Sequence, residues 1–401
     1  METSDWRLVV ELRKIQDAQV EGKTVLVRVD YNVPLEDGRV LDERRIEASL
    51  PTVTWLADHG AKIVLISHLG RPEGKVLEEL RLDPISKSLE ALLGRSIVKL
   101  DDCIGDAVVG AISEMRAGDV LLLENVRFHR EEATNESAFT HQLADLGDVF
   151  VNDAFATMHR AHASTVGLSD HLPSYAGFLV QAEIDALKPL LASPERPYVA
   201  IVGGKKAQSK LGPLHDLAPR VDEIMIGGGV AMTFLHAMGI DVGASIVDHK
   251  VLEEVGLIRK IAAETDTVIH LPVDVVAAPE LSVDSETRIC PVKDIPEGWH
   301  AFDIGPETVQ VFLERIALAR TIVWTGPMGA CELEAFSEGT RDLAAGVAES
   351  DAYSIIGGGE TGEAMERFGV ADKASFISTG GGACLALLRG KTMPALEALR
   401  A

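Results

Sequence analysis

The chain has little cysteine and no long apolar run. Of its 401 residues only four are cysteine, and no two of them form a C-x-x-C pair, which argues against a disulfide framework and a zinc site. No apolar run approaches about 18 residues, the length of a membrane span, and the start of the chain lacks the apolar core of a signal peptide. We therefore expect a reduced, cytoplasmic protein with no membrane segment.

Positive charge is also scarce. Lys and Arg total 38 against 62 Asp and Glu, so the formal net charge is −24 with histidine neutral. A general nucleic-acid binder needs a basic face to neutralise phosphates, and this balance argues against that class. Any site for an anionic ligand must be built locally, against the field of the whole molecule.

The length and composition indicate a folded protein of two or three domains, at roughly 150 residues each. Hydrophobic residues make up 46% and charged residues 25% of the chain. Short β-branched runs alternate with longer amphipathic stretches, a pattern typical of βαβ units with a parallel sheet. The expected strands are 24–29, 63–67, 120–123, 149–152, 198–202, 223–226, 268–271, 321–324, 353–356 and 375–378, with helical spacing at 46–59, 137–146 and 181–191.

A domain boundary is expected near residue 180. Residues 173–177 have the composition of a loop, 181–191 of a helix, and the SPERP segment at 193–197 breaks the chain before the next strand. We therefore predict two α/β domains joined by a helix, with one ligand on each.

The residues that follow the strands differ between the two halves. In the first half the strands lead into polar and cationic segments, and in the second half into glycines. Ligands of open α/β sheets bind beyond the carboxyl ends of the strands, so these segments mark the two candidate sites. The first-half segments are VRVDYNVP (27–34), SHLGRP (67–72), ENVRFHR (124–130) and VNDAFATMHRAHAS (151–164); the second-half segments are VGGKK (202–206), IGGG (226–229), TGPMG (325–329), IGGG (356–359) and STGGG (378–382).

Glycines after a strand let backbone N–H groups approach phosphates, and a following helix adds its positive end. Five such turns in one half favour nucleotide binding over simple tight turns. The chain has no G-x-x-x-x-G-K-[ST] loop and no G-x-G-x-x-G after its first strand, which argues against a P-loop NTPase and a dinucleotide oxidoreductase. Lys205, Lys206 and Lys210 would place ammonium groups beside a polyphosphate.

The first half has arginines and histidines at strand ends. Guanidinium groups match phosphate and carboxylate oxygens bidentately, so these side chains predict a small anionic ligand with both groups. A nucleotide on one domain and such a ligand on the other together indicate phosphoryl transfer. The residues are Arg28, Arg45, Arg71, Arg127, Arg160, His68, His159 and His162.

Eight segments resemble the phosphoglycerate kinase family, in the family's order over essentially the whole chain. The resemblance implies two Rossmann-like domains, each a mostly parallel sheet flanked by helices, joined by a linker helix with an interdomain cleft. The segments are RVDYNVP, HLGRP, ENVRF, NDAFATMHRAHAS, GGKKAQSK, IPEGWHAFDIGPET (295–308), WTGPMGACE (324–332) and STGGGACLALLRGK (378–391).

The resemblance also implies an activity, which is reversible phosphoryl transfer from 1,3-bisphosphoglycerate to MgADP, giving 3-phosphoglycerate and MgATP, after closure of a hinge. It further implies a monomer. The expected domains are residues 1–178 for the glycerate ligand, a linker at 179–196, residues 197–378 for the nucleotide, and a tail at 379–401 that returns to the first domain.

The resemblance assigns site residues by motif position. Arg45 and Lys210 would flank the moving phosphoryl group, and Glu360 would approach Mg²⁺, chiefly through the nucleotide phosphates. The expected catalytic residues are Arg45, Lys206, Lys210, Gly359 and Gly382. The expected substrate residues are Asp30, Tyr31, Asn32, Arg45, His68, Leu69, Gly70, Arg71, Arg127 and Arg160. The expected nucleotide residues are Gly203, Gly204, Lys206, Lys210, Gly228, Pro327, Glu332, Gly358, Gly359, Glu360 and Thr361.

Some positions depart from the family's usual residues. Ser209 and Glu360 stand where the family has Asp, and Thr325 stands where it has Asn. Two alternatives remain at this stage, a non-enzymatic nucleotide-binding relative and a kinase of another carboxylate. Retention of the cationic groups argues against the first, and a five-residue cationic cluster, larger than a monoanion needs, argues against the second.

Overall fold

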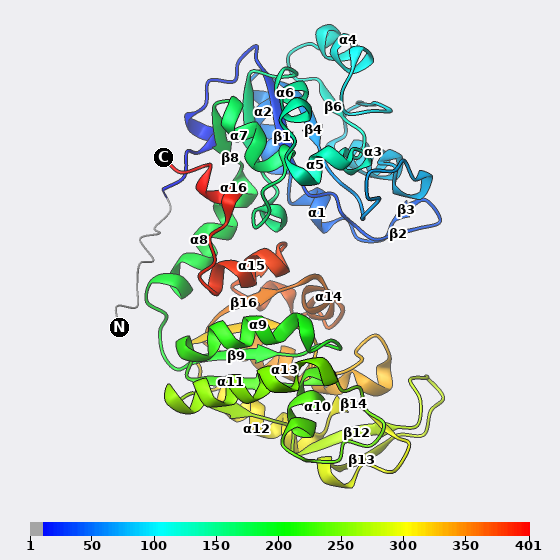
Figure 1. Cartoon of the computed structure of the whole chain (residues 1–401), viewed down its shortest axis with the longest axis vertical. Helices are drawn as coiled ribbons and strands as arrows, with labels where there is room; N and C mark the ends of the chain where they lie inside the picture. Colours follow the sequence, from blue (N-terminus) through cyan, green and yellow to red (C-terminus); the bar gives the residue numbers. More distant parts are fainter. Residues whose placement is uncertain (1–10) are drawn as a thin grey trace. The chain divides into compact units, whose positions relative to one another are not determined.

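The computed structural model describes residues 11–401, which separate into two compact units (Figure 1). The first unit comprises the chain up to Asp185 together with Thr392–Ala401, and the second comprises Ala186–Lys391. The first division falls within the linker expected at 179–196. The second lies after Lys391 rather than at the expected residue 378, because the helix Gly381–Leu388 packs on a strand and a helix of the second unit. Of the described residues, no helix is long and apolar enough to cross a membrane.

The first unit contains a six-stranded sheet in the order β5-β6-β4-β1-β7-β8, with every neighbouring pair parallel. A two-stranded antiparallel ribbon, β2-β3, precedes α1. The strands are β1 (Thr24–Arg28), β2 (Leu35–Glu36), β3 (Arg39–Val40), β4 (Lys62–Ile66), β5 (Ile97–Lys99), β6 (Val120–Leu122), β7 (Val149–Asn152) and β8 (Ser174–Ala176). The helices are α1 (Arg44–Glu47), α2 (Leu50–Asp58), α3 (Asp83–Leu93), α4 (Asp106–Glu114), α5 (Arg130–Thr134), α6 (Ser137–Ala144), α7 (Leu168–His171), α8 (Phe178–Ala192), which continues into the second unit, and α16 (Pro394–Glu397).

Alternate residues of the first sheet pack into two separate cores. Val25 and Val27 of β1 belong to one hydrophobic core together with residues of α2 and α3, and Leu26 belongs to the other together with residues of α4 and α6. Successive side chains of a strand point to opposite faces, so a strand covered by helices on both sides must be apolar at every position. The burial of β1 and β4 explains why these strands appear as continuous apolar runs.

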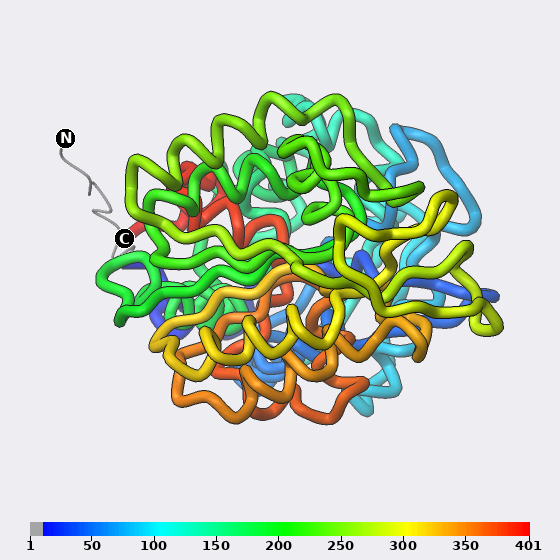
Figure 2. The backbone as a smooth tube through the Cα atoms, turned by 90° about the horizontal axis from the view of Figure 1, so that it is seen from below, coloured from blue at the N-terminus to red at the C-terminus, as the bar shows by residue number. Residues whose placement is uncertain are grey.

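The second unit contains another six-stranded parallel sheet, in the order β11-β10-β9-β15-β16-β17, and a three-stranded antiparallel sheet, β13-β12-β14. Figure 2 shows α11 and α12 on opposite sides of the parallel sheet. The strands are β9 (Tyr198–Val202), β10 (Glu223–Ile226), β11 (Val268–His270), β12 (Asp274–Ala278), β13 (Arg288–Pro291), β14 (His300–Ile304), β15 (Thr321–Thr325), β16 (Tyr353–Gly357) and β17 (Phe376–Ser378). The helices are α9 (Gln208–Leu217), α10 (Gly228–Ala237), α11 (Leu252–Glu264), α12 (Pro306–Ile316), α13 (Glu338–Glu349), α14 (Gly359–Arg367) and α15 (Gly381–Leu388).

Two local expectations are wrong. Residues 173–177, expected as a loop, contain β8, which pairs in parallel with the edge of β7; such a short edge strand depends on its partner rather than on its own pattern. The expected helix 46–59 is divided, because α1 ends at Glu47 and α2 begins at Leu50 with Pro51 in its first turn. Proline is tolerated there since those N–H groups have no partner within the helix.

Candidate functional site

The carboxyl ends of the first sheet's strands lie level with one another. Arg28 at the end of β1 is opposite Ile66 of β4 on one side and Asn152 of β7 on the other. Because the strands are parallel, the segments that follow them emerge at a single edge of the sheet. The predicted residues after β1, β4, β6 and β7 therefore meet at this edge.

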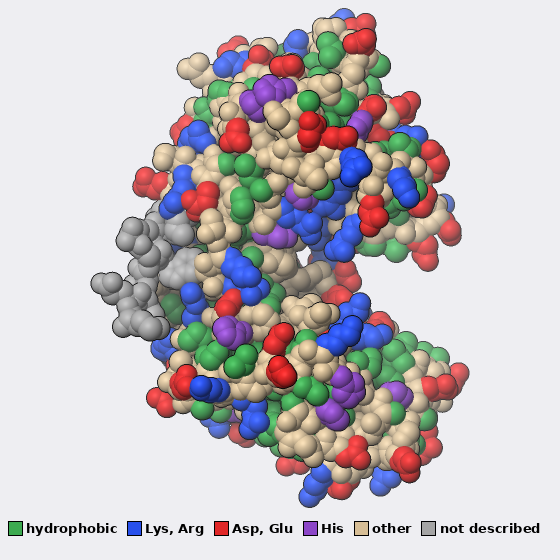
Figure 3. Space-filling view, viewed as in Figure 1, with side chains coloured by type: hydrophobic (Ala, Val, Ile, Leu, Met, Phe, Trp, Pro, Cys, Tyr) green, Lys and Arg blue, Asp and Glu red, His purple; other side chains and the backbone are tan. Residues whose placement is uncertain are grey.

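His68 is surrounded by arginines at this edge. Its side chain is buried, and Nδ1 lies 3.0 Å from Nη2 of Arg28 and 3.7 Å from Oδ1 of Asp30. Burial and the positive charges of four arginines hold the pKa of His68 well below its usual range. Lys and Arg side chains with histidine beside them gather on the first unit (Figure 3). The four arginines are Arg28, Arg127, Arg45 and Arg160.

Arg45 and Arg127 are held by neighbouring predicted residues. Nη1 of Arg45 donates to Oδ2 of Asp30 at 2.7 Å and to the carbonyl of Asn32 at 3.0 Å. Nη1 of Arg127 donates to the carbonyl of Gly70 at 2.7 Å, and burial together with the charges of other arginines lowers its pKa to about 10. Both guanidinium groups are thus placed before any ligand binds.

The Gly70 turn links two of the segments. Its N–H donates to Oδ1 of Asn32 at 2.8 Å, while its carbonyl accepts from Arg127. Gly70 has φ +64°, and a Cβ there would lie 2.8 Å from a methyl group of Leu80. A residue without a side chain is therefore required for this turn.

Three predicted substrate residues are placed differently from the cluster. The side chains of Tyr31 and Leu69 are buried, and the Tyr31 hydroxyl is hydrogen-bonded to Ser49 at 2.9 Å. Burial raises the pKa of Tyr31 above its usual value. Arg71 is exposed. The side chains of Tyr31 and Leu69 are therefore not available to a ligand, and the N–H of Tyr31 already donates to Oγ of Ser67 at 2.9 Å.

Arg28 belongs to the cluster, although the motif assignment omitted it. It is fully buried, and Nε donates to Oγ of Ser164 at 2.8 Å. Ser164 in turn donates through N and Oγ to Glu132, which is also fully buried and lies 3.6 Å from Nδ1 of His162. A buried charge needs such a partner. In the sequence, the feature that could have pointed to Arg28 was a cationic residue at the end of a predicted apolar strand.

The second sheet presents its glycine turns at one edge in the same way. Thr325 of β15 is opposite Val202 of β9 and Gly357 of β16, and Gly357 is opposite Ser378 of β17. Val202 is also opposite Ile226 of β10. The five predicted glycine turns therefore emerge along one edge of this sheet.

Helices begin directly after four of these turns, and the backbones pack closely there. A Cβ at Gly203 would lie 2.1 Å from the carbonyl oxygen of Pro327, and one at Gly228 would lie 2.8 Å from that of Gly204. Gly228 also has φ +61°. The N-termini of α9, α10, α14 and α15 bring their positive dipole ends to this edge, a favourable arrangement for phosphates.

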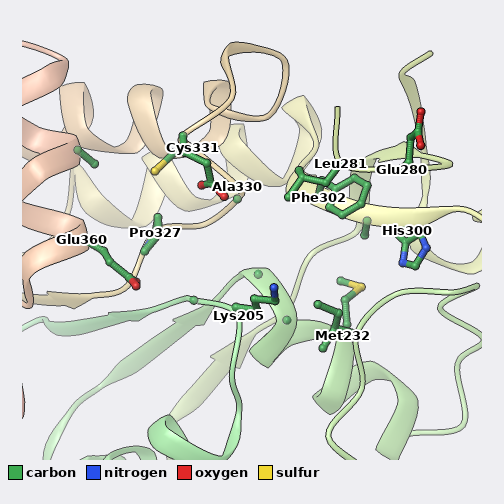
Figure 4. A pocket seen from close by; sticks show the side chains of 18 of the residues that line it. Lys205, Met232, Glu280, Leu281, His300, Phe302, Pro327, Ala330, Cys331 and Glu360 are labelled. Carbon is green, nitrogen blue, oxygen red and sulfur yellow. The ribbon is translucent and has the colours of Figure 1, made fainter. Parts of the chain in front are cut away.

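A pocket of about 1060 Å³ opens beside these turns (Figure 4). Five of the predicted nucleotide residues line it. They are Gly204, Gly228, Pro327, Glu332 and Glu360. The remaining predicted nucleotide residues are not among its lining residues. These are Gly203, Lys206, Lys210, Gly358, Gly359 and Thr361.

The apolar walls of the pocket were missed by the sequence reasoning. They come from α10 and from the antiparallel sheet and its connections, and Figure 4 shows Leu281 and Phe302 on one side with Met232 nearby. Lys205 points into the pocket across from Ala330 and Cys331. Apolar walls with a few polar groups are typical of a site for a planar organic ligand. The segment 295–308, singled out by the family resemblance, was the only sequence feature that pointed to these walls, since it includes Phe302.

Lys210 lies in the first turn of α9. Its Nζ donates to Oγ1 of Thr325 at 2.8 Å, and burial lowers its pKa while the charge of Glu360 opposes that change. Lys206 is exposed, and its carbonyl accepts from Oγ of Ser209 at 2.9 Å. Thr325 and Ser209, which differ from the family's usual residues, thus supply hydroxyl groups. That of Thr325 accepts from Lys210, and that of Ser209 donates to the carbonyl of Lys206.

The residues at the starts of α14 and α15 divide into exposed and structural ones. Gly359, Glu360 and Gly382 are exposed. Thr361 is buried, and its Oγ1 accepts from the N–H of Gly326 at 2.7 Å, which ties α14 to the turn after β15. The exposed residues leave backbone N–H groups and one carboxylate available at the two helix N-termini.

Glu360 suits the expected Mg²⁺. Its carboxylate is exposed, lines the pocket and acts electrostatically on Lys210. Magnesium prefers hard oxygen ligands and is commonly held by one or two carboxylates together with substrate phosphates. The residues present therefore fit this ion.

Each unit is built on a parallel sheet flanked by helices. At the carboxyl ends of the strands, one unit has a cationic cluster and the other has a glycine-edged pocket. These features define a protein of the two-unit α/β kinase class. The phosphoglycerate kinase family model matches residues 15–391. The curated phosphoglycerate kinase of Moorella thermoacetica is 50% identical over 385 residues, covering 96% of this chain and 98% of that protein. The phosphoglycerate kinase of Pelotomaculum thermopropionicum is 48% identical over 390 residues, with the same coverage.

Solved structures agree. That of phosphoglycerate kinase from Coxiella burnetii has a TM-score of 0.82 at 38% identity, and that from Pyrococcus horikoshii a TM-score of 0.87 at 32% identity. Each comparison covers 97% of this chain and 98% of the other. The chain belongs to the phosphoglycerate kinase family, and it is a kinase.

Proposed function

We propose that this chain catalyses reversible phosphoryl transfer from 1,3-bisphosphoglycerate to ADP, giving 3-phosphoglycerate and ATP. The observation that carries the proposal is the gathering of four arginines around buried His68. Such a concentration of positive charge requires a ligand with several negative charges, and guanidinium groups match both carboxylate and phosphate oxygens.

The first unit would bind the glycerate ligand. Arg45, Arg127 and Arg160 would donate to its carboxylate and phosphate oxygens, with Arg71 at the exposed margin. Asp30 and Asn32 act on Arg45 and on the Gly70 turn, to which they are already hydrogen-bonded. Arg28 adds charge from beneath, so the ligand meets a preformed cationic surface.

The second unit would bind the nucleotide in its pocket. The apolar walls around Met232 and Phe302 would hold the base, and Glu332 would meet the ribose. The phosphates would extend toward the glycine turns and helix N-termini, where backbone N–H groups donate to their oxygens. This proposal treats ADP and ATP as ligands of the same pocket.

Transfer would depend on charge neutralisation and alignment. Lys210 and Arg45 would flank the oxygens of the moving phosphoryl group, and the N–H groups of Gly359 and Gly382 would donate to it. Because the two ligands bind different units, we propose that the units close together during the reaction. Closure would exclude water that otherwise hydrolyses the acyl phosphate.

Mg²⁺ would be held near Glu360, mainly through the nucleotide phosphates. When bound, the ion neutralises charge on the phosphate oxygens. Glu360 is one methylene longer than the Asp usual in the family, so it reaches further from the start of α14. We further propose a monomer that acts in the cytoplasm, which light scattering and cell fractionation would check.

A coupled assay of purified protein with ATP and 3-phosphoglycerate tests the proposal. Lys210→Ala and Arg45→Ala are expected to lower kcat by about 10²- to 10³-fold, because each removes a donor aimed at transition-state charge. Matched controls are Lys260→Ala and Arg39→Ala, which remove exposed cations from α11 and β3. Both controls are expected to keep wild-type rates.

Two results would contradict the proposal. Protein that binds ADP without turnover would indicate a non-enzymatic relative. Comparable turnover with acetate as the acceptor would indicate a kinase of another carboxylate, since a monoanion does not use the whole arginine cluster.

A further inference from the structure

A cluster of three potential metal ligands lies in the first unit, apart from the residues of the proposed transfer reaction. Asp102 and Cys103 follow β5, and His129 directly precedes α5. The two segments are joined because β5 and β6 are paired and the N–H of Glu124 donates to the carbonyl of Asp102 at 3.3 Å. His129 thus meets Asp102, which is 27 positions away in sequence, beyond the ends of neighbouring strands.

The three side chains are already oriented toward one another. Oδ1 of Asp102 lies 2.7 Å from Nε2 of His129 and accepts from the N–H of Cys103 at 2.7 Å. The His129 ring stacks on Phe139 with centroids 5.2 Å apart. One potential ligand atom from each of the three residues lies within 4.8 Å of the others.

These separations approach those of a metal centre. Zinc binds nitrogen and oxygen at about 2.0–2.2 Å and thiolate sulfur at about 2.3 Å, so ligand atoms of a tetrahedral ion lie about 3.3–3.7 Å apart. Shifts of about an ångström would reach this geometry. The Asp102 side chain is 55% exposed and that of His129 27%, which leaves an entry path and room for water as a fourth ligand.

The charge of the cluster also suits a dication. Cys103 is buried directly beside the carboxylate of Asp102, whose Oδ1 accepts from the N–H of Cys103. A cation would relieve that negative environment. On binding, the thiol proton is released to solvent and a sulfur–metal bond forms, so thiolate and carboxylate together balance two positive charges.

We propose that Asp102, Cys103 and His129 bind a thiophilic divalent metal ion of the Zn²⁺ type. Thiolate and imidazole favour such ions over Mg²⁺, which prefers oxygen, so this site is chemically distinct from the one near Glu360. A bound ion would cross-link the segment after β5 to the segment that carries Arg127.

Titration of the reduced full-length protein with Co²⁺ under anaerobic conditions tests the proposal. We expect one equivalent to bind with intense visible bands of tetrahedral cobalt and a near-ultraviolet sulfur-to-cobalt charge-transfer band. Zn²⁺ should displace the cobalt, and excess Mg²⁺ should not. Cys103→Ser should remove the charge-transfer band. Asp102→Asn and His129→Gln should weaken binding by more than the roughly 10- to 100-fold that loss of an outer partner costs.

The control is Cys290→Ser, which removes another buried thiol, in β13 of the second unit, and should leave the spectrum unchanged. Since Asp102 and His129 are partly exposed, their variants keep the test informative if Cys103→Ser does not fold. The proposal is overturned if folded wild-type protein shows no charge-transfer band, which would leave an Asp102–His129 ion pair only. It is equally overturned if the band survives Cys103→Ser or disappears in Cys290→Ser.

Discussion

Lys210 is positioned by a single hydroxyl group at the end of β15. Its ammonium donates to Oγ1 of Thr325, a fully buried residue on a neighbouring strand. Hydrogen bonds to charged groups contribute about 1.5–3 kcal/mol when one partner is removed. Thr325 is therefore a positioning residue that acts on the reaction through Lys210.

Thr325→Val, which keeps the shape but removes the hydroxyl, is expected to lower kcat about tenfold with little change in the KM for ATP, because Lys210 loses its anchor. Steady-state kinetics with varied ATP measures both constants. Thr325→Ser restores the hydroxyl and should recover most of kcat. A Thr325→Val enzyme with unchanged kcat would show that Lys210 is positioned by other groups.

Asp153 is a buried carboxylate beneath the start of α8. Its Oδ1 accepts from the N–H groups of Leu179 and Val180 at 2.9 and 3.2 Å, while Oδ2 has no hydrogen-bond partner among the described residues. Burial raises the pKa of Asp153 to about 6, although a hydrogen bond with the side chain of Thr52 and those with the two N–H groups oppose the shift. The folded protein therefore binds this proton more tightly than the unfolded chain does.

Because the folded pKa is the higher one, Asp153 lowers the free energy of unfolding as pH rises from about 4 to about 6. Asp153→Asn keeps the Oδ1 acceptor and removes the titration. It is expected to flatten that pH dependence and to gain up to about 3 kcal/mol at neutral pH, from a shift of about two units. Urea unfolding from pH 4 to 7 measures this, with exposed Asp170→Asn as the control. Parallel curves for wild type and Asp153→Asn would contradict it.

At the scale of elements, the helices of the nucleotide edge depend on close backbone contact. A Cβ at Gly381 would lie 2.6 Å from Cα of Gly358 and 3.1 Å from its nitrogen. Neither atom belongs to a flexible side chain that could move away. The starts of α14 and α15 therefore approach as closely as they do only because position 381 has no side chain.

Gly381→Ala is expected to destabilise the second unit by about 1–3 kcal/mol, the usual cost of overpacking, and to lower kcat by displacing the N–H of Gly382. Gly256→Ala in α11 is the control, since no atom of residues 11–401 lies within 4 Å of its Cβ position; it should be neutral or stabilise by up to about 1 kcal/mol. Chemical unfolding compares the two variants. Equal stabilities would mean that α15 can shift without cost.

Most strands of the two parallel sheets could be predicted from sequence, including the three-residue strands β6, β11 and β17, whereas the antiparallel strands could not. The expected strands 149–152, 198–202 and 223–226 coincide with β7, β9 and β10, because a strand buried on both faces must be apolar throughout. The structure adds β5, β8 and the three strands of the antiparallel sheet. In β13 only Cys290 is buried, so no continuous apolar run marks that strand. The strand β12 is mostly buried, and its apolar run at 275–278 was missed.

At the scale of the whole molecule, the two ends of the described chain belong to the same unit. The N–H of Arg13 donates to the carbonyl of Leu399, and that of Ala401 donates to Glu11. The side chains of Met393, Leu396 and Leu399 are buried. The last ten residues therefore complete the first unit rather than the second.

Truncation after Lys391 is expected to destabilise the first unit by about 5 kcal/mol, from three buried side chains at about 1.5–3 kcal/mol each. Hydrogen exchange should then accelerate in β1, β4 and β7 while β9 and β15 stay protected. Glu397→Ala, which removes only a surface ion pair with Arg400, serves as the control and should change stability by less than about 1 kcal/mol. Equal acceleration in both units would contradict this assignment of the tail.

The net charge of −24 coexists with concentrated positive charge. Arg45, Arg127 and Arg160 all act on His68 in the first unit, while Lys210 lies at the nucleotide edge of the second. That these cations face the interdomain cleft implied by the family resemblance stays a prediction. Within each unit, cations gather where the proposed ligand's charge would lie, and they do so against an acidic background.

By itself the sequence determined the α/β class, the positions of most parallel strands, the glycine turns and the family. Burial periodicity and a turn's need for glycine are local properties, so they can be read from neighbouring residues. Only the tertiary structure decided that Arg28 binds Ser164, that Lys210 binds Thr325, and that Asp102 meets His129. These pairs depend on strand order and register, which bring distant segments together by packing and which no local pattern encodes.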